Sequence, residues 1–152
     1  MRSAAELFTA HLHYLTADFD TWKGLFARDA VIEYPYGAAA RVESPLYGIA
    51  AITKSVAGFL NAVTNFRTGT PNIHQIEGED AIIAEFSADA EVVLTGRGYH
   101  QDYTVYLRAG EGKIVLLREY FDPTRVVAAF VPYRENLDLS SAPSAASVST
   151  GR

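Results

Sequence analysis

The residue best suited to chemistry in this chain is Glu119, which lies in the segment 113–123, Lys-Ile-Val-Leu-Leu-Arg-Glu-Tyr-Phe-Asp-Pro. The segment predicts a strand with apolar residues on both faces, and alternation places Glu119 on one face with Val115, Leu117 and Phe121. A carboxylate between Leu117 and Phe121 either is paired or has its pKa raised by desolvation. A carboxyl group in the second state can transfer protons near neutral pH. The sequence therefore indicates a pocket with one candidate acid/base.

Three tyrosines are candidates for hydroxyl groups that act beside this carboxyl. Tyr34 lies on an earlier predicted strand, where its phenol could hydrogen-bond a carbonyl or the carboxylate, or could simply pack in the core. Tyr99 and Tyr103 have the same parity on a later strand, so both face inward if Val105 and Leu107 do. We expect the later pair to contact a ligand.

Seven further side chains are predicted around the same pocket. Six are apolar, with core packing as the main role and the pocket wall as the second: Trp22, Phe26, Phe59, Phe86, Leu117 and Phe121. His74 lies on a predicted strand, where a lone histidine is most often structural, and a place in the pocket wall is the alternative. Asp102 has the opposite parity to Tyr103 and is predicted to pair with Arg118 on the outer face. The alternative is a second catalytic acid, which would require a bulge that reverses the parity.

The elements that must position these residues follow from apolar periodicity and turn signals. Helices come first and long strands separated by glycine-containing turns come later, which is an α+β pattern. The predicted elements are helices over 4–17 and around 20–26, a strand over 30–36, a helix over 48–63, strands over 73–77, 81–94, 99–108 and 113–121, and a short helix over 124–130.

This order predicts a cone, in which a strongly curved, mostly antiparallel sheet wraps over three N-terminal helices and a short C-terminal helix follows. We expect a single domain over 1–136 and a disordered Ser/Ala-rich tail over 137–152. Strands that are apolar on both faces need a cover on the outer face, and a homodimer that pairs sheet against sheet would supply it.

Composition excludes several classes of function. A net charge of −5 with scattered basic residues argues against nucleic acid as a partner. No apolar run approaches the roughly 20 residues of a membrane span, and no signal peptide is recognised, so we expect no membrane partner and a cytoplasmic protein. The absence of cysteine removes thiolate chemistry, and four scattered histidines without a His-x-x-x-His pattern predict no metal site. Glycine-rich nucleotide motifs are absent too, so no cofactor is expected.

Three segments resemble the nuclear transport factor 2-like superfamily, the cone-shaped α+β fold of ketosteroid isomerase, SnoaL-like polyketide cyclases and limonene epoxide hydrolase. They are 29–34 (Asp-Ala-Val-Ile-Glu-Tyr), 47–52 (Tyr-Gly-Ile-Ala-Ala-Ile) and 118–122 (Arg-Glu-Tyr-Phe-Asp). The last is most similar to the branch of the phenazine-biosynthesis A/B proteins, and the order of elements resembles the superfamily over residues 4–130.

The resemblance implies roles for individual residues. The acidic residue at the position of Glu119 is a pocket acid/base in the phenazine proteins and in the epoxide hydrolase, and Tyr99 matches a pocket tyrosine of the former. The chain also departs from both patterns. Phe86 and Ala88 stand where the epoxide hydrolase needs Arg and Asp, and Ser55 stands where the phenazine proteins use His. Neither specific reaction is therefore expected.

The favoured interpretation is a cofactor-free enzyme in which Glu119 and Tyr34 are catalytic and the substrate is a small apolar or aromatic metabolite. Isomerisation, cyclisation, dehydration and condensation all fit this set of groups, and the resemblance favours a step in secondary metabolism. The alternatives are a non-catalytic binding protein for hydrophobic small molecules and a dimerisation scaffold. In them Glu119 orients a ligand, or is a structural carboxylate tied to Tyr34, Arg41 or a backbone amide.

Overall fold

The computed structural model describes residues 1–132, so the predicted tail over 137–152 lies outside the described residues. Within residues 1–132 the chain forms four α-helices, one 3-10 helix and seven strands. In chain order these are α1 (Ala4–Ala17), α2 (Phe19–Lys23), β1 (Phe26–Glu33), η1 (Gly37–Ala40), β2 (Leu46–Tyr47), α3 (Gly48–Ala62), β3 (Val63–Thr68), β4 (Asn72–Gln75), β5 (Ala81–Val92), β6 (Gly98–Gly110), β7 (Lys113–Tyr120) and α4 (Pro123–Phe130).

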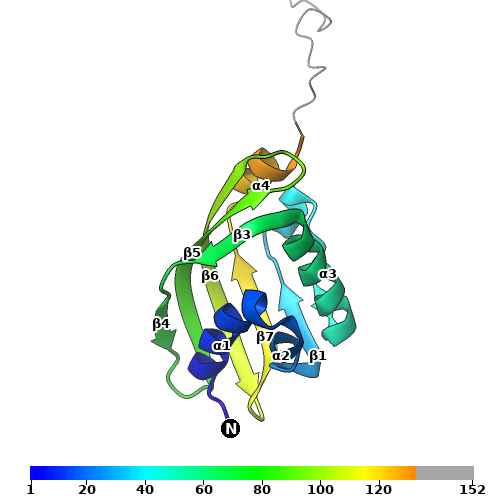
Figure 1. The fold of residues 1–152 in the computed structure, drawn as a ribbon. Coiled ribbons are helices and arrows are strands. Elements are labelled where there is room, and N and C mark those ends of the chain that lie inside the picture. Colours follow the sequence, from blue (N-terminus) through cyan, green and yellow to red (C-terminus); the bar gives the residue numbers. More distant parts are fainter. Residues whose placement is uncertain (133–152) are drawn as a thin grey trace, which may run out of the picture.

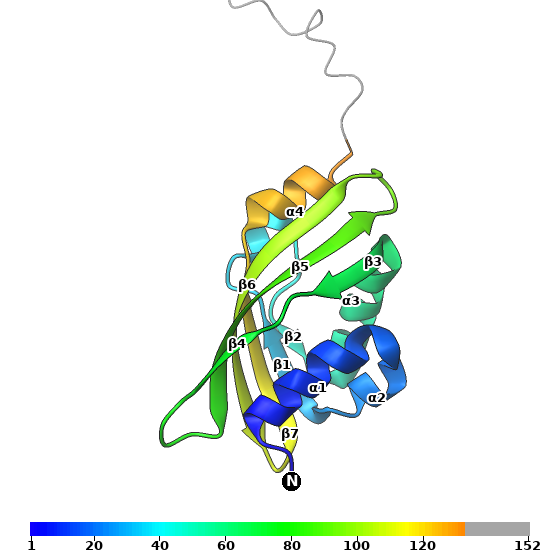
Figure 2. The ribbon, with the colours of Figure 1, turned by 60° about the vertical axis from the view of Figure 1, so that its left-hand side comes forward.

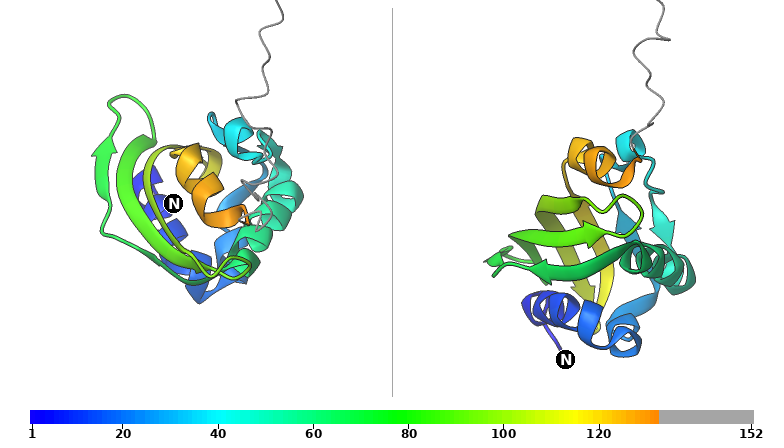
Figure 3. Two further views of the ribbon diagram at one scale, coloured as in Figure 1. Left: turned by 90° about the horizontal axis from the view of Figure 1, so that it is seen from above. Right: turned by 45° about the horizontal axis from the view of Figure 1, so that its top comes forward.

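The strands of the described residues form one curved sheet in the order β2-β1-β7-β6-β5-β3, and β4 pairs with the first half of β5. Neighbouring strands are antiparallel except β1 and β7, which are parallel. Figures 1 and 2 show α1, α2 and α3 on the concave side of the sheet, and Figure 3 shows α4 beside η1 at one end. The predicted α+β cone is confirmed.

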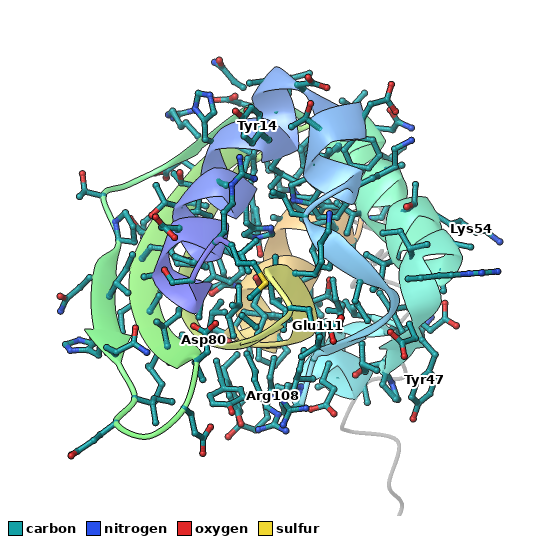
Figure 4. All side chains as sticks on the ribbon, turned by 90° about the horizontal axis from the view of Figure 1, so that it is seen from below. Tyr14, Tyr47, Lys54, Asp80, Arg108 and Glu111 are labelled. Carbon is teal, nitrogen blue, oxygen red and sulfur yellow. The ribbon has the colours of Figure 1, made fainter. Side chains whose placement is uncertain are left out.

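The first helix is anchored at both its start and its buried face. Ser3 and Glu6 form a capping box, in which each side chain accepts a hydrogen bond from the other residue's N–H. The N–H of Ala4 donates to Asp80 Oδ1 at 2.8 Å. Asp80 is labelled in Figure 4, which views the molecule from below. The face turned to the sheet buries Leu7, Phe8, His11 and Leu15. Periodicity and capping thus suffice to explain why α1 crosses the concave side.

Two local predictions were wrong. The helix predicted over 48–63 ends at Ala62, and residues 63–68 form β3, which was not predicted. Asn65 has a φ of 58° and the pairing of β3 with β5 shifts in register there, so the alternation that reveals a strand is broken. Phe26, which was predicted on the second helix, opens β1 because α2 ends at Lys23.

The convex face of the sheet carries ion pairs rather than a continuous apolar surface. Arg118 Nε lies 2.6 Å from Glu33 Oε2, and Arg125 Nη1 lies 2.9 Å from Asp102 Oδ2. The predicted pair of Asp102 with Arg118 is therefore wrong, because Glu33 on the adjacent strand lies directly opposite Arg118. Membrane-spanning helices are not found among residues 1–132.

Candidate active-site cavity

A cavity of about 440 Å³ lies between the concave face of the sheet, the helices and the segment 40–43. Side chains from α1, α2, α3, α4 and five strands contribute to its wall. A second depression of about 560 Å³ lies on the convex side over Glu85, Asp102 and Tyr120, but it is open and does not contain the candidate acid/base. The enclosed cavity is therefore the candidate site.

The cavity brings together nine of the eleven predicted site residues. They are Glu119, Tyr34, Tyr99, Tyr103, Trp22, Phe59, Phe86, Leu117 and Phe121.

Glu119 lies one residue before the end of β7, on the concave face. Leu117 and Phe121 flank it on the strand, and Val105 of β6 lies opposite. Within residues 1–132 its carboxyl group has no hydrogen bond and no ion pair. Desolvation by burial raises the pKa of Glu119 from 4.5 to about 7. The group can therefore both give and take a proton at neutral pH.

Tyr34 lies beside Glu119 because of the parallel pairing of β1 with β7. Ile32 and Glu33 lie opposite Leu117 and Arg118, so the next residue of each strand, Tyr34 and Glu119, lie side by side. The N–H of Tyr34 donates to Ser44 Oγ at 2.8 Å, which fixes the backbone where the strand has ended. Burial first and the charge of Glu119 second raise the pKa of the Tyr34 phenol, which stays protonated.

A hydrogen-bonded chain runs from Gln101 through Tyr99 to Tyr103. Gln101 is fully buried, and its Nε2 donates to the carbonyl oxygen of Asp122 at 2.8 Å while its Oε1 accepts from the N–H of Asp122 at 3.1 Å. These backbone contacts orient the amide, so the bond of 3.2 Å from Gln101 Nε2 to Tyr99 Oη has the amide as donor. Tyr99 Oη lies 3.1 Å from Tyr103 Oη.

This arrangement favours Tyr103 as the end of the chain that donates into the cavity. Because Tyr99 Oη accepts from Gln101, it can turn its own proton to Tyr103, which keeps its proton for a partner in the cavity. Tyr103 and Glu119 are diagonal neighbours on the concave face, since Glu119 pairs with Val105 and Tyr103 lies two residues before Val105 on the same strand. Burial and then the charge of Glu119 raise the pKa of Tyr103 well above its usual value.

His11 is a polar group in the cavity wall that was not predicted as a site residue. The indole Nε1–H of Trp22 donates to His11 Nδ1 at 2.9 Å. Desolvation lowers the pKa of His11 from 6.5 to about 4, so the imidazole is neutral at pH 7. Since Nδ1 accepts a hydrogen bond, the proton of the neutral ring is on Nε2.

Aromatic rings form much of the remaining wall. Phe86 stacks on Tyr103 with ring centroids 5.0 Å apart, and Phe121 contacts the ring of Tyr34 at 5.9 Å. Phe59 of α3 contacts Phe130 of α4 at 6.0 Å, where the helix closes the end of the cone. Such a wall suits a planar apolar ligand with few polar groups.

Two predicted ligand contacts, Phe26 and His74, do not line the cavity. Phe26 packs on Trp22 at 4.8 Å and on His11, so it supports the wall from behind. His74 lies on the edge strand β4, exposed, with its Nε2 3.8 Å from Glu85 Oε2 on the outer face. Both predictions are corrected, because Phe26 belongs to a strand and β4 lies at the rim of the sheet.

Several lining residues were not predicted, and their signals differ. Ser55 stands where the phenazine proteins use His, and Arg41 and Glu43 lie between the strand predicted over 30–36 and the helix predicted over 48–63. His11 lies on the face of α1 that also buries Leu7 and Leu15, and its four-residue spacing from both is a signal that could have indicated burial. The other unpredicted lining residues are Leu12, Leu15, Ile32, Ala40, Val42, Val56, Ala62, Phe66, Val126 and Phe130.

No metal site is apparent in the part of the chain that the structure describes, since it has no group of three or more His, Asp or Glu side chains that could hold an ion. The ionisable and hydroxyl groups that line the cavity are the carboxyl groups of Glu119 and Glu43, three phenols, the hydroxyl of Ser55, the guanidinium of Arg41 and one neutral imidazole. This set can move protons and donate hydrogen bonds.

Known proteins are similar to this chain in sequence and in fold. The uncharacterized protein YesE of Bacillus subtilis is 31% identical over 121 residues, 78% of this chain and 80% of YesE. An uncharacterized PhzA/B-like protein of Pseudomonas aeruginosa is 28% identical over 128 residues, 84% of this chain and 89% of that protein. The crystal structure of a candidate isomerase from Bacillus subtilis is similar with a TM-score of 0.76 and 29% identity, covering 83% of this chain and 91% of that one.

A family model for the SnoaL-like domain matches residues 5–117. The resemblance found in the sequence is thereby confirmed. The chain belongs to the SnoaL-like family of the nuclear transport factor 2-like fold.

Proposed function

We propose that the protein is a cofactor-free acid/base enzyme that acts on a small apolar or aromatic carbonyl compound. The observation that carries this proposal is the buried Glu119 carboxyl, which has no partner in residues 1–132 and lies beside phenol hydroxyls. A pKa of about 7 makes this group half ionised at neutral pH, which suits a general base that must also return the proton.

In the proposed reaction, the Glu119 carboxylate removes a proton from the carbon next to a substrate carbonyl. The electron pair of that C–H bond moves into the C–C bond, and the carbonyl oxygen takes up the negative charge as an enolate. Tyr103 donates its hydrogen bond to this oxygen, with Tyr34 as the second donor. Where a C=C bond extends the enolate, the protonated Glu119 returns the proton to the far carbon, which gives isomerisation. Alternatively the enolate carbon attacks a second carbonyl carbon and Glu119 returns its proton to the alkoxide that forms, which gives cyclisation or condensation.

The apolar wall would bind the hydrocarbon part of the substrate. Trp22, Phe59, Phe86, Leu117 and Phe121 offer rings and methyl groups, and Tyr99 lines the same cavity. The candidate isomerase from Bacillus subtilis, to which the chain is similar, is consistent with proton transfer as the chemistry. The similarity to a PhzA/B-like protein is consistent with a role in secondary metabolism.

We also propose that the chain forms a homodimer through the convex face of the sheet. Ile83, Tyr106, Leu116 and Tyr120 lie there among the ion pairs. A mixture of apolar, aromatic and paired charged groups is usual in protein–protein interfaces.

Deuterium exchange of bicyclic aromatic ketones such as 2-tetralone, followed by proton NMR in D₂O, tests the catalytic proposal. We expect wild type to accelerate exchange next to the carbonyl, and Glu119→Gln to lower this rate by roughly 10²–10⁴-fold. Glu85→Gln, on the outer face of the same sheet, is the matched control and should leave the rate unchanged. Full activity of Glu119→Gln would contradict the proposal.

The same experiment separates the enzyme from a carrier. The mostly apolar lining favours binding of hydrophobic molecules as a second candidate function. Wild-type protein that binds the ketones, measured by quenching of the fluorescence of Trp22, but never exchanges their protons would be a carrier.

A further inference from the structure

We propose that the cavity takes a ligand with polar groups at two ends, and that His11 binds the second of them, an uncharged oxygen acceptor such as a ketone, ester or ether. This inference deepens the proposed function and rests on it for the use of the cavity as the substrate site. It assigns His11 a direct hydrogen bond to a part of the ligand other than the carbon that Glu119 would deprotonate.

The hydrogen bond from Trp22 determines which nitrogen of the His11 imidazole carries the proton. Trp22 can only donate at its Nε1, so the nitrogen of His11 that lies 2.9 Å away accepts and carries no proton. The proton of the neutral ring is therefore on Nε2. Burial that disfavours a charged imidazole keeps the ring in this state across the neutral range.

The second step is the access of that proton to the cavity. His11 is 7% exposed and lines the cavity. Its Nε2 has no hydrogen-bond partner among residues 1–132. Every fully enclosed side-chain nitrogen or oxygen in this part of the chain does have a partner, so Nε2 is not fully enclosed. The Nε2–H is therefore in contact with cavity space and is open to an acceptor there.

The third step is the separation of the two polar ends. His11 contacts Phe8 at 5.9 Å, Phe8 contacts Phe86 at 5.7 Å, and Phe86 stacks on Tyr103 at 5.0 Å. Two phenyl rings thus separate the imidazole from the phenol beside Glu119. A ligand that satisfies both ends has an apolar, ring-like body between two oxygen functions.

The fourth step is the charge of the ligand at this end. A neutral imidazole held by an indole offers one N–H and no positive charge. Arg41 also lines the cavity, but desolvation alone shifts the pKa of His11, so no neighbouring charge acts on the imidazole. A carboxylate at His11 would therefore lose its hydration without a counterion there. A ketone or ester oxygen loses far less and gains the hydrogen bond. Neutral histidine is a known electrophile toward carbonyl oxygens.

The test compares two isosteric probes, 6-acetyl-2-naphthol and 6-isopropenyl-2-naphthol, which differ only in the oxygen of the acetyl group. We expect wild type to bind the acetyl probe roughly 10-fold more tightly, the value of about one hydrogen bond. His11→Phe should remove this preference and His13→Phe, an exposed neighbour on the same helix, should keep it. If His11→Phe does not fold, His11→Gln, which retains an N–H donor, should keep part of the preference.

Nitrogen-15 NMR of the histidines gives an independent readout. We expect the Nε2–H tautomer of His11 in the free protein and a change in its Nε2 signal with the acetyl probe only. An equal preference in wild type and His11→Phe, an Nδ1–H tautomer, or no binding of the acetyl probe would each overturn the inference. Glu119→Gln should leave the preference for the acetyl probe intact. If wild type shows the preference but exchanges no ketone protons, the catalytic proposal fails. If wild type exchanges ketone protons but shows no preference that depends on His11, the His11 inference fails.

Discussion

Within the described residues 1–132, Glu119 lacks the ion pair or hydrogen bond that usually accompanies a buried carboxylate in a folded protein. Its neighbours are phenols and apolar side chains, and the phenols keep their protons because burial and the nearby carboxylate both raise their pKa values. The charged form of Glu119 is therefore costly in the folded state. That cost is also what places its proton affinity in the range useful for catalysis.

Removing this carboxyl should stabilise the protein at high pH. Between 4.5 and about 7 the folded state of wild type binds more protons than the unfolded state, so its free energy of unfolding falls as pH rises through this window. We expect Glu119→Gln to be more stable than wild type at pH 8 by about 1–3 kcal/mol and equally stable below pH 4.5. Urea denaturation at both pH values, with Glu85→Gln as control, measures the difference. A difference that does not depend on pH would contradict the buried-carboxyl interpretation.

The hydrogen-bonded phenols should contribute unequally to catalysis. Tyr103→Phe removes the donor next to the reacting oxygen, and we expect the rate of ketone exchange to fall by roughly 10²-fold. Tyr99→Phe removes only the group that polarises Tyr103, so a fall of about 10-fold is expected. Exchange rates of both variants on 2-tetralone measure this order. A larger effect of Tyr99→Phe would mean that Tyr99 is the donor to the substrate.

At the scale of elements, β6 and β7 carry most of the candidate chemistry, and alternation predicted which face of each strand is turned inward. The prediction for β7 is correct for Leu117, Glu119 and Phe121 but not for its start. Ile114 is fully buried there instead of Val115, because the pairing with β6 shifts in register next to Ala109. A bulge reverses parity, and periodicity alone does not reveal it.

The site could be predicted only where a residue's role follows from its own strand. The positions of Glu119, Tyr99 and Tyr103 follow from alternation in this way. The hydrogen bonds that orient Gln101, and the hydrogen bond between Trp22 and His11, join different elements, and such contacts are not specified by one sequence. The sequence therefore indicated the candidate acid/base but missed the hydrogen bonds that orient Tyr99, Tyr103 and His11.

Gln101 should be essential to the junction of β7 with α4. The amide nitrogen and oxygen of Gln101 both bind the backbone of Asp122, the N-cap of α4. Gln101→Met therefore leaves the N–H and the carbonyl oxygen of Asp122 without these partners. We expect a loss of roughly 2–4 kcal/mol in the free energy of unfolding. Gln75→Met is the matched control, since Gln75 also donates to backbone carbonyls but is exposed, and it should cost under about 1 kcal/mol. Equal losses in the two variants, measured by urea denaturation, would contradict this role.

At the scale of the whole molecule, the sheet curves around the helices (Figure 3), and side chains from nearly every element line the candidate cavity. The fold class could be predicted because helices with 3.6-residue periodicity precede strands with glycine-containing turns. The expectation of an apolar outer face was less accurate, because Arg118 and Arg125 pair with acidic residues there. Assembly through that face thus depends on paired charges as well as on apolar contacts.

The proposed homodimer predicts a mass in solution of twice 16.6 kDa. Thr104→Arg adds a bulky charge to the middle of the convex face and should shift the protein to monomer, because that charge must lose its hydration in the interface. Thr9→Arg, on the exposed side of α1, should leave the dimer intact. Sedimentation equilibrium measures all three, and a monomeric wild type would contradict the proposal.

The central claim is that Glu119 is a desolvated carboxyl that exchanges protons near neutral pH. Difference infrared spectroscopy of wild type against Glu119→Gln, recorded across a pH titration, measures its pKa directly. We expect a protonated carboxyl band that disappears with a midpoint near pH 7. A midpoint at or below the ordinary value of 4.5 would show a solvated or paired carboxylate and would contradict the proposed acid/base role.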